Sequence, residues 1–415
     1  MPLSQQTLKR HHGSIYLHVL ASSLLTTILG LGALLAVRIQ VQSARLHRDG
    51  AEARACAASA IEVGLLCIKQ DSSWRTTWPN GAWLENKPLG EGRFSLEGVD
   101  PVDGALSDSP YEPVVLTGTG TRGAARHKAQ VTLVPVIRPL EALSTCLHGS
   151  DLIRINNTRR LTVVGAPLSA NGQLTNNGTL DGSAEVDTAN PVGAITGTLT
   201  APAPAKPMPV ATLITDYASR ATSIPYTGDI DKAVLAPGCN PWGPTDPNGL
   251  YVLDTGGNAL TIRNTRIHGT LIIRAPNKTV TLEGAMHCQN HQSYFPVLLV
   301  EGNLVIKCNS ADAVLSEAVN ATNYNPIGAP YGGAYDTDAS DTYPNEIRGL
   351  IHAKGTLTLQ QTARIVGTIV CEGAITCDGT NTIVHDPGLS ACPPNGYRYV
   401  DGMAISPGSW KQVVD

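Results

Sequence analysis

The sequence is poor in charge and in aromatic side chains. Charged residues make up 15% of the 415 positions, and only two phenylalanines are present. A formal net charge of −4 gives no electrostatic basis for binding a polyanion, so we expect no nucleic-acid partner. The motifs GxSxG, HExxH and the P-loop do not occur, and their absence argues against an enzyme and against a cofactor.

Cysteine is too dilute to define a small disulfide scaffold, because nine cysteines are spread over the whole chain. If the chain is exported, some of them can pair, but an odd number leaves at least one thiol free or shared between chains. Glycine, in contrast, is abundant, with 41 residues. Together with many Asn and Thr residues, it favours stacked β-turns in which β-branched side chains fill a core.

A long apolar run lies near the N-terminus. It extends from Ser14 to Val37 and contains no Asp, Glu, Lys or Arg, and His18 is its only basic side chain. At 1.5 Å per residue the run is about 36 Å long, enough to cross a hydrocarbon core of roughly 30 Å. An Ala-rich stretch without proline follows as far as Gln70. We therefore predict a single helix over residues 14–70, of which the first part spans a membrane.

The charges on either side of this run predict the orientation of the helix in the membrane. Two basic residues precede it, and four arginines follow it, namely Arg38, Arg45, Arg48 and Arg54. By the positive-inside rule, this distribution places the large C-terminal part in the cytoplasm. The resemblance described next implies the opposite orientation, and we give the resemblance precedence.

The start of the run resembles the type IV pilins and the related minor pseudopilins, whose signature is a short basic leader, a glycine and a long apolar helix. Here the basic residues 9–12 precede Gly13 and Ser14. The resemblance implies that a prepilin peptidase cleaves between Gly13 and Ser14 and that the remainder is exported. His18 occupies the fifth mature position, where the family usually has Glu, and this departure resembles tip-type minor subunits. The alternative is an ordinary signal anchor that is never cleaved.

Residues 71–147 alternate between apolar and polar side chains and contain turn signals, which predicts a small antiparallel β region. A GxGxxG sequence occurs at Gly118, Gly120 and Gly123. A dinucleotide site needs a helix to start at these glycines, but a strand pattern follows them, so we interpret the sequence as a hairpin. A helix followed by a small sheet is also the arrangement of the pilin family.

The pattern changes to a repeat in residues 148–415. Apolar residues recur every six positions, and Gly349–Leu359 aligns with Gly367–Cys377 at an offset of 18. Eighteen is three sixes, which predicts a parallel β-helix with three faces per turn, with a β-sandwich as the alternative. The period does not fix the handedness. Alternation places four side chains inside (Ile351, Leu357, Ile369 and Ile375) and three outside (Thr358, Thr368 and Thr376).

Several segments interrupt this repeat. A Pro-rich run leads into residues 210–219, predicted to be a short helix packed on the outside, and residues 309–346 form a long polar loop. The repeat resembles polymer-forming, bactofilin-like β-helices. By the same resemblance, the C-terminal segment from His385 to Trp410 is expected to cap the open end of the solenoid.

Two groups of side chains are candidate metal ligands, although we expect no metal. The first group has tetrahedral-type ligands: His287, Cys288, His291 and Cys308. The second is an acidic loop that could hold Ca²⁺, although a solvated loop is the preferred interpretation: Asp336, Asp338, Asp341 and Glu346. Cys288 and Cys308 are alternatively core residues or a disulfide, and Cys371 and Cys377 are further disulfide candidates.

These patterns predict a mainly β protein with one long N-terminal transmembrane helix. Its parts are a leader (1–13), a helix (14–70), a small pilin-like antiparallel β region (71–147) and a parallel β-helix (148–415). We expect a structural, non-enzymatic subunit of a type IV pilus or a type II secretion-like filament. It would lie in the bacterial inner membrane as a single-pass protein, with its ectodomain in the periplasm or outside the cell, and its partners would be membrane lipid and other filament subunits.

Two alternatives remain open. The first is an anchored, adhesin-like module that binds a surface glycan or protein. The second is a carbohydrate-active β-helix enzyme, which is disfavoured because the acids of the repeats are isolated and their aromatic residues are few.

Overall fold

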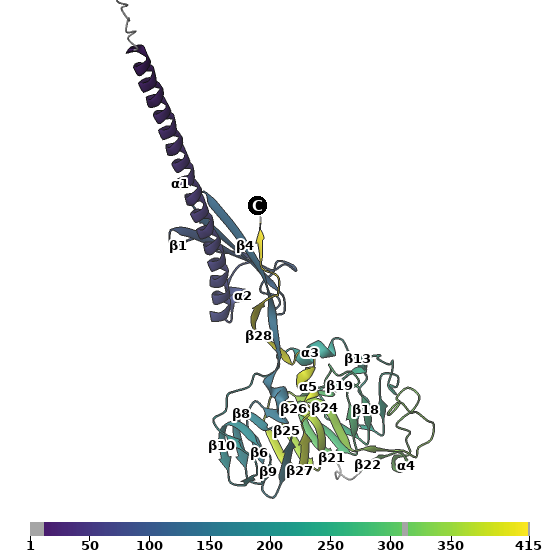
Figure 1. Cartoon of the computed structure of the whole chain (residues 1–415). Helices are drawn as coiled ribbons and strands as arrows, with labels where there is room; N and C mark the ends of the chain where they lie inside the picture. Colours follow the sequence, from purple (N-terminus) through teal and green to yellow (C-terminus); the bar gives the residue numbers. More distant parts are fainter. Residues whose placement is uncertain (1–11, 309–313, 414–415) are drawn as a thin grey trace, which may run out of the picture. The chain divides into compact units, whose positions relative to one another are not determined.

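The structure is a computed structural model that describes residues 12–308 and 314–413. The chain forms two compact units (Figure 1). The helix–sheet unit comprises the chain up to residue 137 together with residues 400 onward, and the solenoid unit comprises residues 138–399. The predicted leader, residues 1–13, lies outside the described residues except for its last two.

One uninterrupted helix, α1 (His12–Gln70, 59 residues), opens the helix–sheet unit, and the short α2 (Trp74–Thr77) follows it. Ala and Leu dominate α1 and no proline breaks it. Its C-terminal half packs on strands β2 and β3. This contact buries small and medium side chains, among them Ala53, Cys56, Ala57, Ala60 and Ile61. The helix predicted for residues 14–70 is confirmed.

The sheet of this unit is antiparallel and has six strands. Four are consecutive: β1 (Gly81–Leu89), β2 (Gly92–Val99), β3 (Val114–Arg122) and β4 (Ala125–Pro139). The other two come from the C-terminus, β28 (Arg398–Ile405) and β29 (Lys411–Val413), and both pair with β4.

The prediction that the C-terminal segment from His385 to Trp410 caps the solenoid is therefore wrong for its second half. The backbone groups of β28 and β29 pair with the exposed edge of β4, for example between Lys411 and Gln130. An unpaired strand edge is a strong acceptor for another strand, wherever in the sequence that strand lies. The solenoid thus occupies an insertion between β4 and β28.

Glycines in β3 allow the helix and the sheet to approach closely. A Cβ atom added at Gly120 would lie 2.0 Å from the Ala53 carbonyl oxygen, and one added at Gly118 would lie 2.2 Å from the Ala57 carbonyl oxygen. β3 and β4 form the hairpin that the GxGxxG sequence predicted, and its turn joins Arg122 to Ala125.

The solenoid unit is a stack of parallel strands that the chain builds in two runs. The first run contains β5 (Leu147–Gly149), β6 (Ile153–Ile155), β7 (Arg160–Val164), β8 (Leu168–Asn176), β9 (Thr179–Asp181), β10 (Ala184–Pro191), β11 (Ala194–Ile195) and β12 (Leu199–Thr200). The second begins with β13 (Thr222–Ile224), β14 (Ile230–Asp231), β15 (Val234–Leu235), β16 (Leu250–Asp254), β17 (Leu260–Arg263), β18 (Arg266–His268) and β19 (Thr270–Gly284). It ends with β20 (His287–Gln289), β21 (Leu298–Cys308), β24 (Glu346–Ala353), β25 (Leu357–Gln361), β26 (Arg364–Cys371) and β27 (Ile375–Val384).

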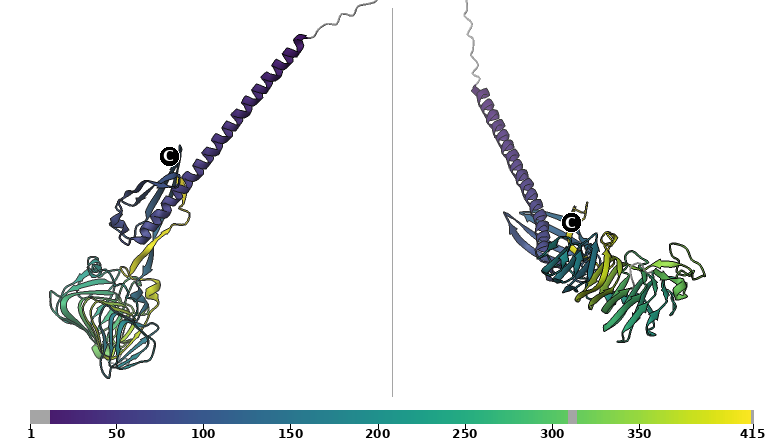
Figure 2. Two further views of the ribbon diagram at one scale, coloured as in Figure 1. Left: turned by 90° about the vertical axis from the view of Figure 1, so that its left-hand side faces the viewer. Right: turned by 90° about the horizontal axis from the view of Figure 1, so that it is seen from below.

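The two runs do not stack in sequence order. β26 and β27, at the end of the second run, pair with β5, β6 and β7, at the start of the first. The chain therefore enters the stack in its middle and builds outward to β12. It then crosses to the far end at β13 and returns to the middle. Figures 1 and 2 show this order as yellow strands lying between blue and green ones.

The 18-residue repeat is confirmed for the last turn of the second run, where Gly349 pairs with Gly367 and Leu357 with Ile375. Other turns differ in length: Leu147 pairs with Leu168, 21 positions later, and Leu250 with Thr270, 20 positions later. The four side chains predicted to point inward, Ile351, Leu357, Ile369 and Ile375, are fully buried in one continuous core. The parallel β-helix, rather than the β-sandwich, is the fold of this unit.

One side chain predicted to lie outside is buried. Thr358 and Thr376 are half-buried on the outer side, but Thr368 is fully buried and its hydroxyl donates to the Thr145 carbonyl oxygen at 2.8 Å. Residues 140–145, which include the 3₁₀ helix η1 (Glu141–Ser144), cover this part of the stack. Alternation along a strand gives the direction of a side chain but not what covers it.

A second layer packs on this covered face. The helix α3 (Leu213–Ala218) lies against β19 and β21, as the Pro-rich run predicted, and α5 (Gly388–Ala391) contacts η1. Leu213, Ile214 and Tyr217 join apolar side chains that point away from the solenoid core, such as Leu299 and Val370. In the loop of residues 309–346, β22 (Val314–Ser316) pairs with β23 (Thr342–Pro344), next to the short helix α4 (Glu317–Asn320).

Replacing Gly120 by Ala will destabilise the helix–sheet unit, because the new Cβ meets backbone atoms of α1 that cannot move independently. We expect a loss of about 3 kcal/mol. The measurement is denaturant unfolding of the full chain in detergent, followed by the fluorescence of Trp74 and Trp83, which are buried in this core. The control is Gly50→Ala on α1, where no atom lies within 4 Å. It should be neutral or stabilising by up to about 1 kcal/mol, and equal losses in the two variants would contradict the close approach.

Ile369→Asp will unfold or strongly destabilise the solenoid unit, because it places an unpaired charge in the dry core. We expect the free energy of unfolding to fall by about 3 kcal/mol or more. The matched control is Thr376→Asp, since Thr376 lies on the outer side between Thr358 and Arg154. We expect its melting temperature, followed by the circular dichroism of the sheet, to stay close to that of the wild type. Similar losses at both positions would mean that the inward register is wrong.

Candidate functional site

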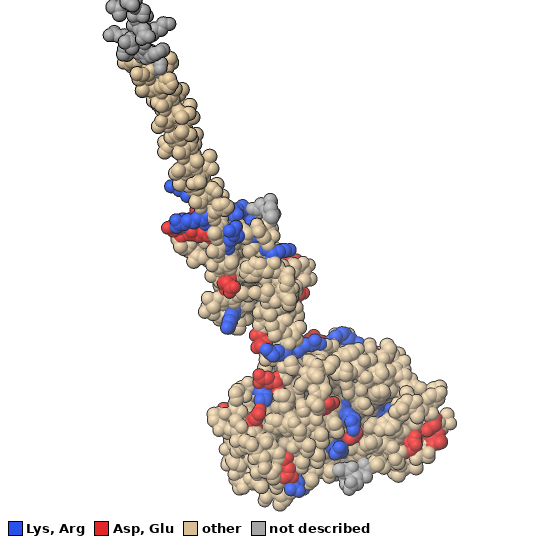
Figure 3. Space-filling model, in the orientation of Figure 1, with Lys and Arg blue, Asp and Glu red and all other residues tan. Residues whose placement is uncertain are grey.

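The N-terminal half of α1 is an apolar surface with no neighbour in the described chain. Every large apolar side chain from Ile15 to Val41 is at least 45% exposed, and the helix is long and apolar enough to cross a membrane. Residues 15–37 contain no Lys, Arg, Asp or Glu, and the space-filling view shows the first described part of the helix without charged side chains (Figure 3). An amphipathic surface helix has one apolar stripe, whereas this helix is apolar on all sides. Such a surface is stable only against lipid or against other apolar helices.

Four hydroxyl side chains of this half, two Ser and two Thr, form hydrogen bonds within the helix. The hydroxyls of Ser22 and Ser23 donate to the carbonyl oxygens of Val19 and Leu20, and those of Thr26 and Thr27 donate to the carbonyl oxygens of Ser22 and Ser23. Such back-bonding gives each of these four hydroxyls an acceptor in an apolar environment. The hydroxyls therefore do not oppose burial of this half in lipid.

A group of charges marks the point where α1 reaches the sheet. The Arg122 guanidinium donates to Asp49 at 2.9 Å and also to Glu52 and Glu91, and Arg48 lies 3.4 Å from Glu91. These bonds, led by the one to Glu52, raise the pKa of Arg122. The group joins α1 to the end of β3 and separates the exposed apolar half from the half that packs on the sheet.

Gly13 and Ser14, the predicted processing site, lie in the first turn of α1. Lys9 and Arg10, which complete the leader signature, lie outside the described residues. Processing at Gly13 stays a prediction.

The predicted ligands His287, Cys288, His291 and Cys308 do not converge on one point. His287 and Cys288 are neighbours on β20, so their side chains lie on opposite sides of the strand. Cys288 and Cys308 belong to the solenoid core, whereas the His287 Nδ1 bonds to the Pro344 carbonyl oxygen at 2.9 Å. His291 is exposed and its ring packs edge-on against that of His268. Spacing along the sequence could not reveal this division between inside and outside.

The four cysteines named as disulfide candidates are not paired, since all nine cysteines are free thiols. The Cys371 thiol lies 3.2 Å from the Gly355 carbonyl oxygen, and the Cys377 thiol lies 3.8 Å from the Gly379 carbonyl oxygen. These two cysteines stand on different strands of the stack, β26 and β27. Burial raises the pKa of the thiols of Cys308 and Cys371 to about 12.

Three of the four predicted acidic ligands lie close together, and the fourth does not. Carboxylate oxygens of Asp336 and Asp338 lie within 4.8 Å of each other and of Glu317, a residue that the sequence analysis did not select. Asp341 is nearby, because the Asn325 side-chain amide donates both to its carboxylate, at 3.1 Å, and to the Asp336 carboxylate, at 3.4 Å. Glu346 instead forms ion pairs with two arginines of the solenoid, Arg348 and Arg364.

Glu317, the buried member of this group, is already satisfied. Its carboxylate accepts hydrogen bonds from the backbone N–H groups of Tyr324 and Asp341 and from the Tyr343 hydroxyl. A carboxylate with three donors stabilises the loop without a cation. Its function in the structure is to hold residues 317–343 together.

A second acidic group was not predicted. It lies in the loop between β2 and β3, where residues 100–112 carry four acids. The available signal was a run of four acids among turn residues between two strands.

The geometry defines a class: a mainly β chain with one long apolar N-terminal helix, a small antiparallel sheet and a parallel β-helix. Neither a family model nor a curated protein matches the sequence. Among solved structures, an ice-binding protein from an Antarctic biological consortium is 14% identical, with a TM-score of 0.30, and the match covers 59% of this chain and 90% of that one.

A match to the competence-associated pilin ComZ of Thermus thermophilus covers 88% of this chain and 98% of that one, at 11% identity and a TM-score of 0.28. A match to a domain of an ice-binding protein of Shewanella frigidimarina covers 60% and 98%, at 12% identity and a TM-score of 0.24. At these identities and scores the likenesses carry no functional argument.

Thiol labelling will separate free from paired cysteines. In the native protein purified without reductant, the exposed Cys392 should react quickly with a maleimide, and Cys392→Ser should remove that rapid phase. The core thiols Cys288, Cys308, Cys371 and Cys377 should react only after unfolding, because they are buried and protonated. Nine labels per unfolded chain are expected, and seven or fewer would indicate a disulfide.

Proposed function

We propose that this chain is a membrane-anchored structural subunit of a pilin-like filament and that it displays its β-solenoid outside the cytoplasm. The observation that carries the proposal is the division of one continuous helix into two halves. The first half is apolar on every side and exposed, and the second half is fixed to a small antiparallel sheet. Anchoring and display are the functions that such a molecule serves without bond-making chemistry.

The exposed half suits two environments in succession. From Ile15 to Val37 the helix is about 35 Å long at 1.5 Å per residue, so it crosses a hydrocarbon core of roughly 30 Å. Small residues on the same half, such as Ala21, Gly30, Gly32 and Ala33, allow close contact between helices. The same surface therefore serves as a membrane anchor before assembly and as a helix–helix interface within a filament.

The packed half argues for a filament subunit over a simple anchor. A simple anchor needs only a flexible connection to its ectodomain, whereas here Ala53 and Ala57 meet β3 at backbone contact distance. The charged group around Arg122 holds the same junction. A rigid junction transmits the position of the apolar half to the sheet, which an ordered filament requires.

The test is the variant Gly13→Val. A leader peptidase that requires a small residue before the bond will leave this variant as a precursor longer by residues 1–13, and the precursor will be missing from sheared surface filaments. The matched control is Gly13→Ala, which keeps the residue small and should be processed. The measurement is the N-terminal sequence and mass of the protein in the membrane and filament fractions.

Two outcomes would overturn the proposal. A wild-type protein that retains Met1 would be an ordinary uncleaved anchor. In intact spheroplasts, external protease should also remove the chain beyond residue 70, and full protection would place the large part in the cytoplasm, as the arginine distribution suggests.

A further inference from the structure

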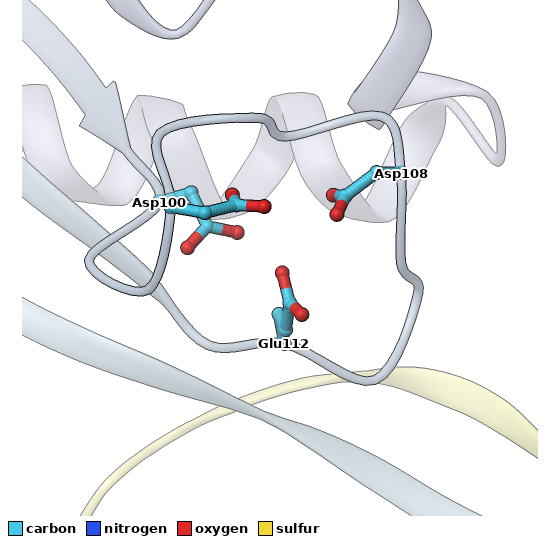
Figure 4. Close-up of side chains that lie close together, drawn as sticks. Asp100, Asp108 and Glu112 are labelled. Atoms are coloured by element: carbon cyan, nitrogen blue, oxygen red, sulfur yellow. The ribbon is translucent and has the colours of Figure 1, made fainter.

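The loop between β2 and β3 brings four carboxylates together. The four residues are Asp100, Asp103, Asp108 and Glu112. Each contributes one carboxylate oxygen, and these four oxygens all lie within 4.8 Å of one another. Figure 4 shows Asp100, Asp108 and Glu112 with their carboxylates turned toward one another. Like charges at this distance repel each other, so this arrangement needs a compensating positive charge.

Asp100 is the buried member of the group, with only 3% of its surface exposed. Its Oδ1 accepts a hydrogen bond from the Val102 N–H at 2.7 Å, which fixes the start of the loop. Its Oδ2 has no hydrogen-bond donor among the described residues. The Oε2 of Glu112 is likewise buried and without a donor. Leaving buried carboxylate oxygens without a partner is costly, and this cost distinguishes the group from a solvated acidic surface.

Arg75 lies near these acids but donates no hydrogen bond to their carboxylate oxygens. Arg75 donates to the carbonyl oxygen of Leu106 at 3.1 Å and to that of Glu112, and its guanidinium packs on the Trp74 ring. Its hydrogen bonds therefore close the loop through the backbone, and its single charge acts on three acids, Asp100, Glu112 and Asp108, without donating to their oxygens.

We propose that Asp100, Asp103, Asp108 and Glu112 form a binding site for a hard divalent cation of the size of Ca²⁺. Ca²⁺ binds carboxylate oxygens at about 2.3–2.6 Å, so ligands on opposite sides lie up to roughly 5 Å apart. Mg²⁺ keeps several of its waters and is usually bound through only one or two carboxylates. A set of four carboxylates, with oxygens that all lie within 4.8 Å of one another, therefore suits Ca²⁺ better.

The cation would fix the loop of residues 100–112 against α2. Arg75 of α2 already binds both Leu106 and Glu112, so the loop has one fixed side and one side of mutually repelling acids. Binding a cation to the acids completes the closure. The site is independent of the filament proposal, because it requires only the folded helix–sheet unit.

The experiment uses the full chain in detergent after treatment with a chelator. Tb³⁺, which replaces Ca²⁺ at oxygen sites, should give luminescence on tryptophan excitation, because Trp74 is next to Arg75 at the loop. Unlabelled Ca²⁺ should displace it. Millimolar CaCl₂ should raise the melting temperature followed by tryptophan fluorescence by about 3 °C or more, and MgCl₂ should have a smaller effect.

Two variants test the ligands. Asp108→Asn removes an exposed acid without disturbing the core and should weaken Tb³⁺ binding at least about tenfold. Asp100→Asn keeps an oxygen for the Val102 N–H, and it should abolish the Ca²⁺-dependent shift in melting temperature. The matched control is the double variant Asp336→Asn/Asp338→Asn in the solenoid unit, which should bind as the wild type does.

Three results would overturn the proposal. The first is no Ca²⁺-dependent shift in the wild type together with a stability that rises as the pH falls, which would indicate a proton shared by Asp100 and Glu112. The second is binding that Asp108→Asn leaves unchanged. The third is binding lost in the control double variant, which would place the site in the solenoid unit. Failure of the Gly13→Val test would leave this site unaffected.

Discussion

The parallel pairing of β26 and β27 with β5, β6 and β7 is the contact on which the solenoid unit depends. It joins residues far apart in the sequence, as the bond from Thr368 to the Thr145 carbonyl oxygen across 223 positions illustrates. Without it the two runs would be separate stacks, each with an additional open strand edge. Because loop closure over such distances is slow, we expect this junction to form after the turns on either side of it.

The same junction explains how a solenoid can occupy an insertion within a small sheet. A stack built in sequence order would begin at one end and finish at the other, so its two ends would be far apart. Here the chain enters and leaves at the middle of the stack, and the Leu140 N–H donates to the Tyr397 carbonyl oxygen at 2.9 Å. Adjacent entry and exit points are the condition under which a domain can be inserted into another without disrupting it. β4 and β28 can then pair directly.

Much of this architecture was predictable because it depends on local patterns. The 18-residue offset and the inward positions of Ile351 and Ile369 follow from alternation, which is a property of each strand by itself. The stacking order was not predictable, because every turn offers a similar apolar ladder and the sequence does not say which turns meet. Burial of Thr368 and the pairing of the C-terminal strands were missed for the same reason. Both depend on a segment that is distant in the sequence.

The difference between the two acidic groups was also not predictable from the sequence. Glu317 and Asp100 both lie among turn residues, so the sequence gives no basis for treating them differently. In the fold, the Glu317 carboxylate accepts three hydrogen bonds from its own loop, whereas one oxygen of Asp100 is buried without a donor. A satisfied carboxylate stabilises a loop, and an unsatisfied one needs a proton or a cation. A cation site is therefore defined by the carboxylate oxygens that the tertiary structure leaves without hydrogen-bond donors, and not by the number of acids in the sequence.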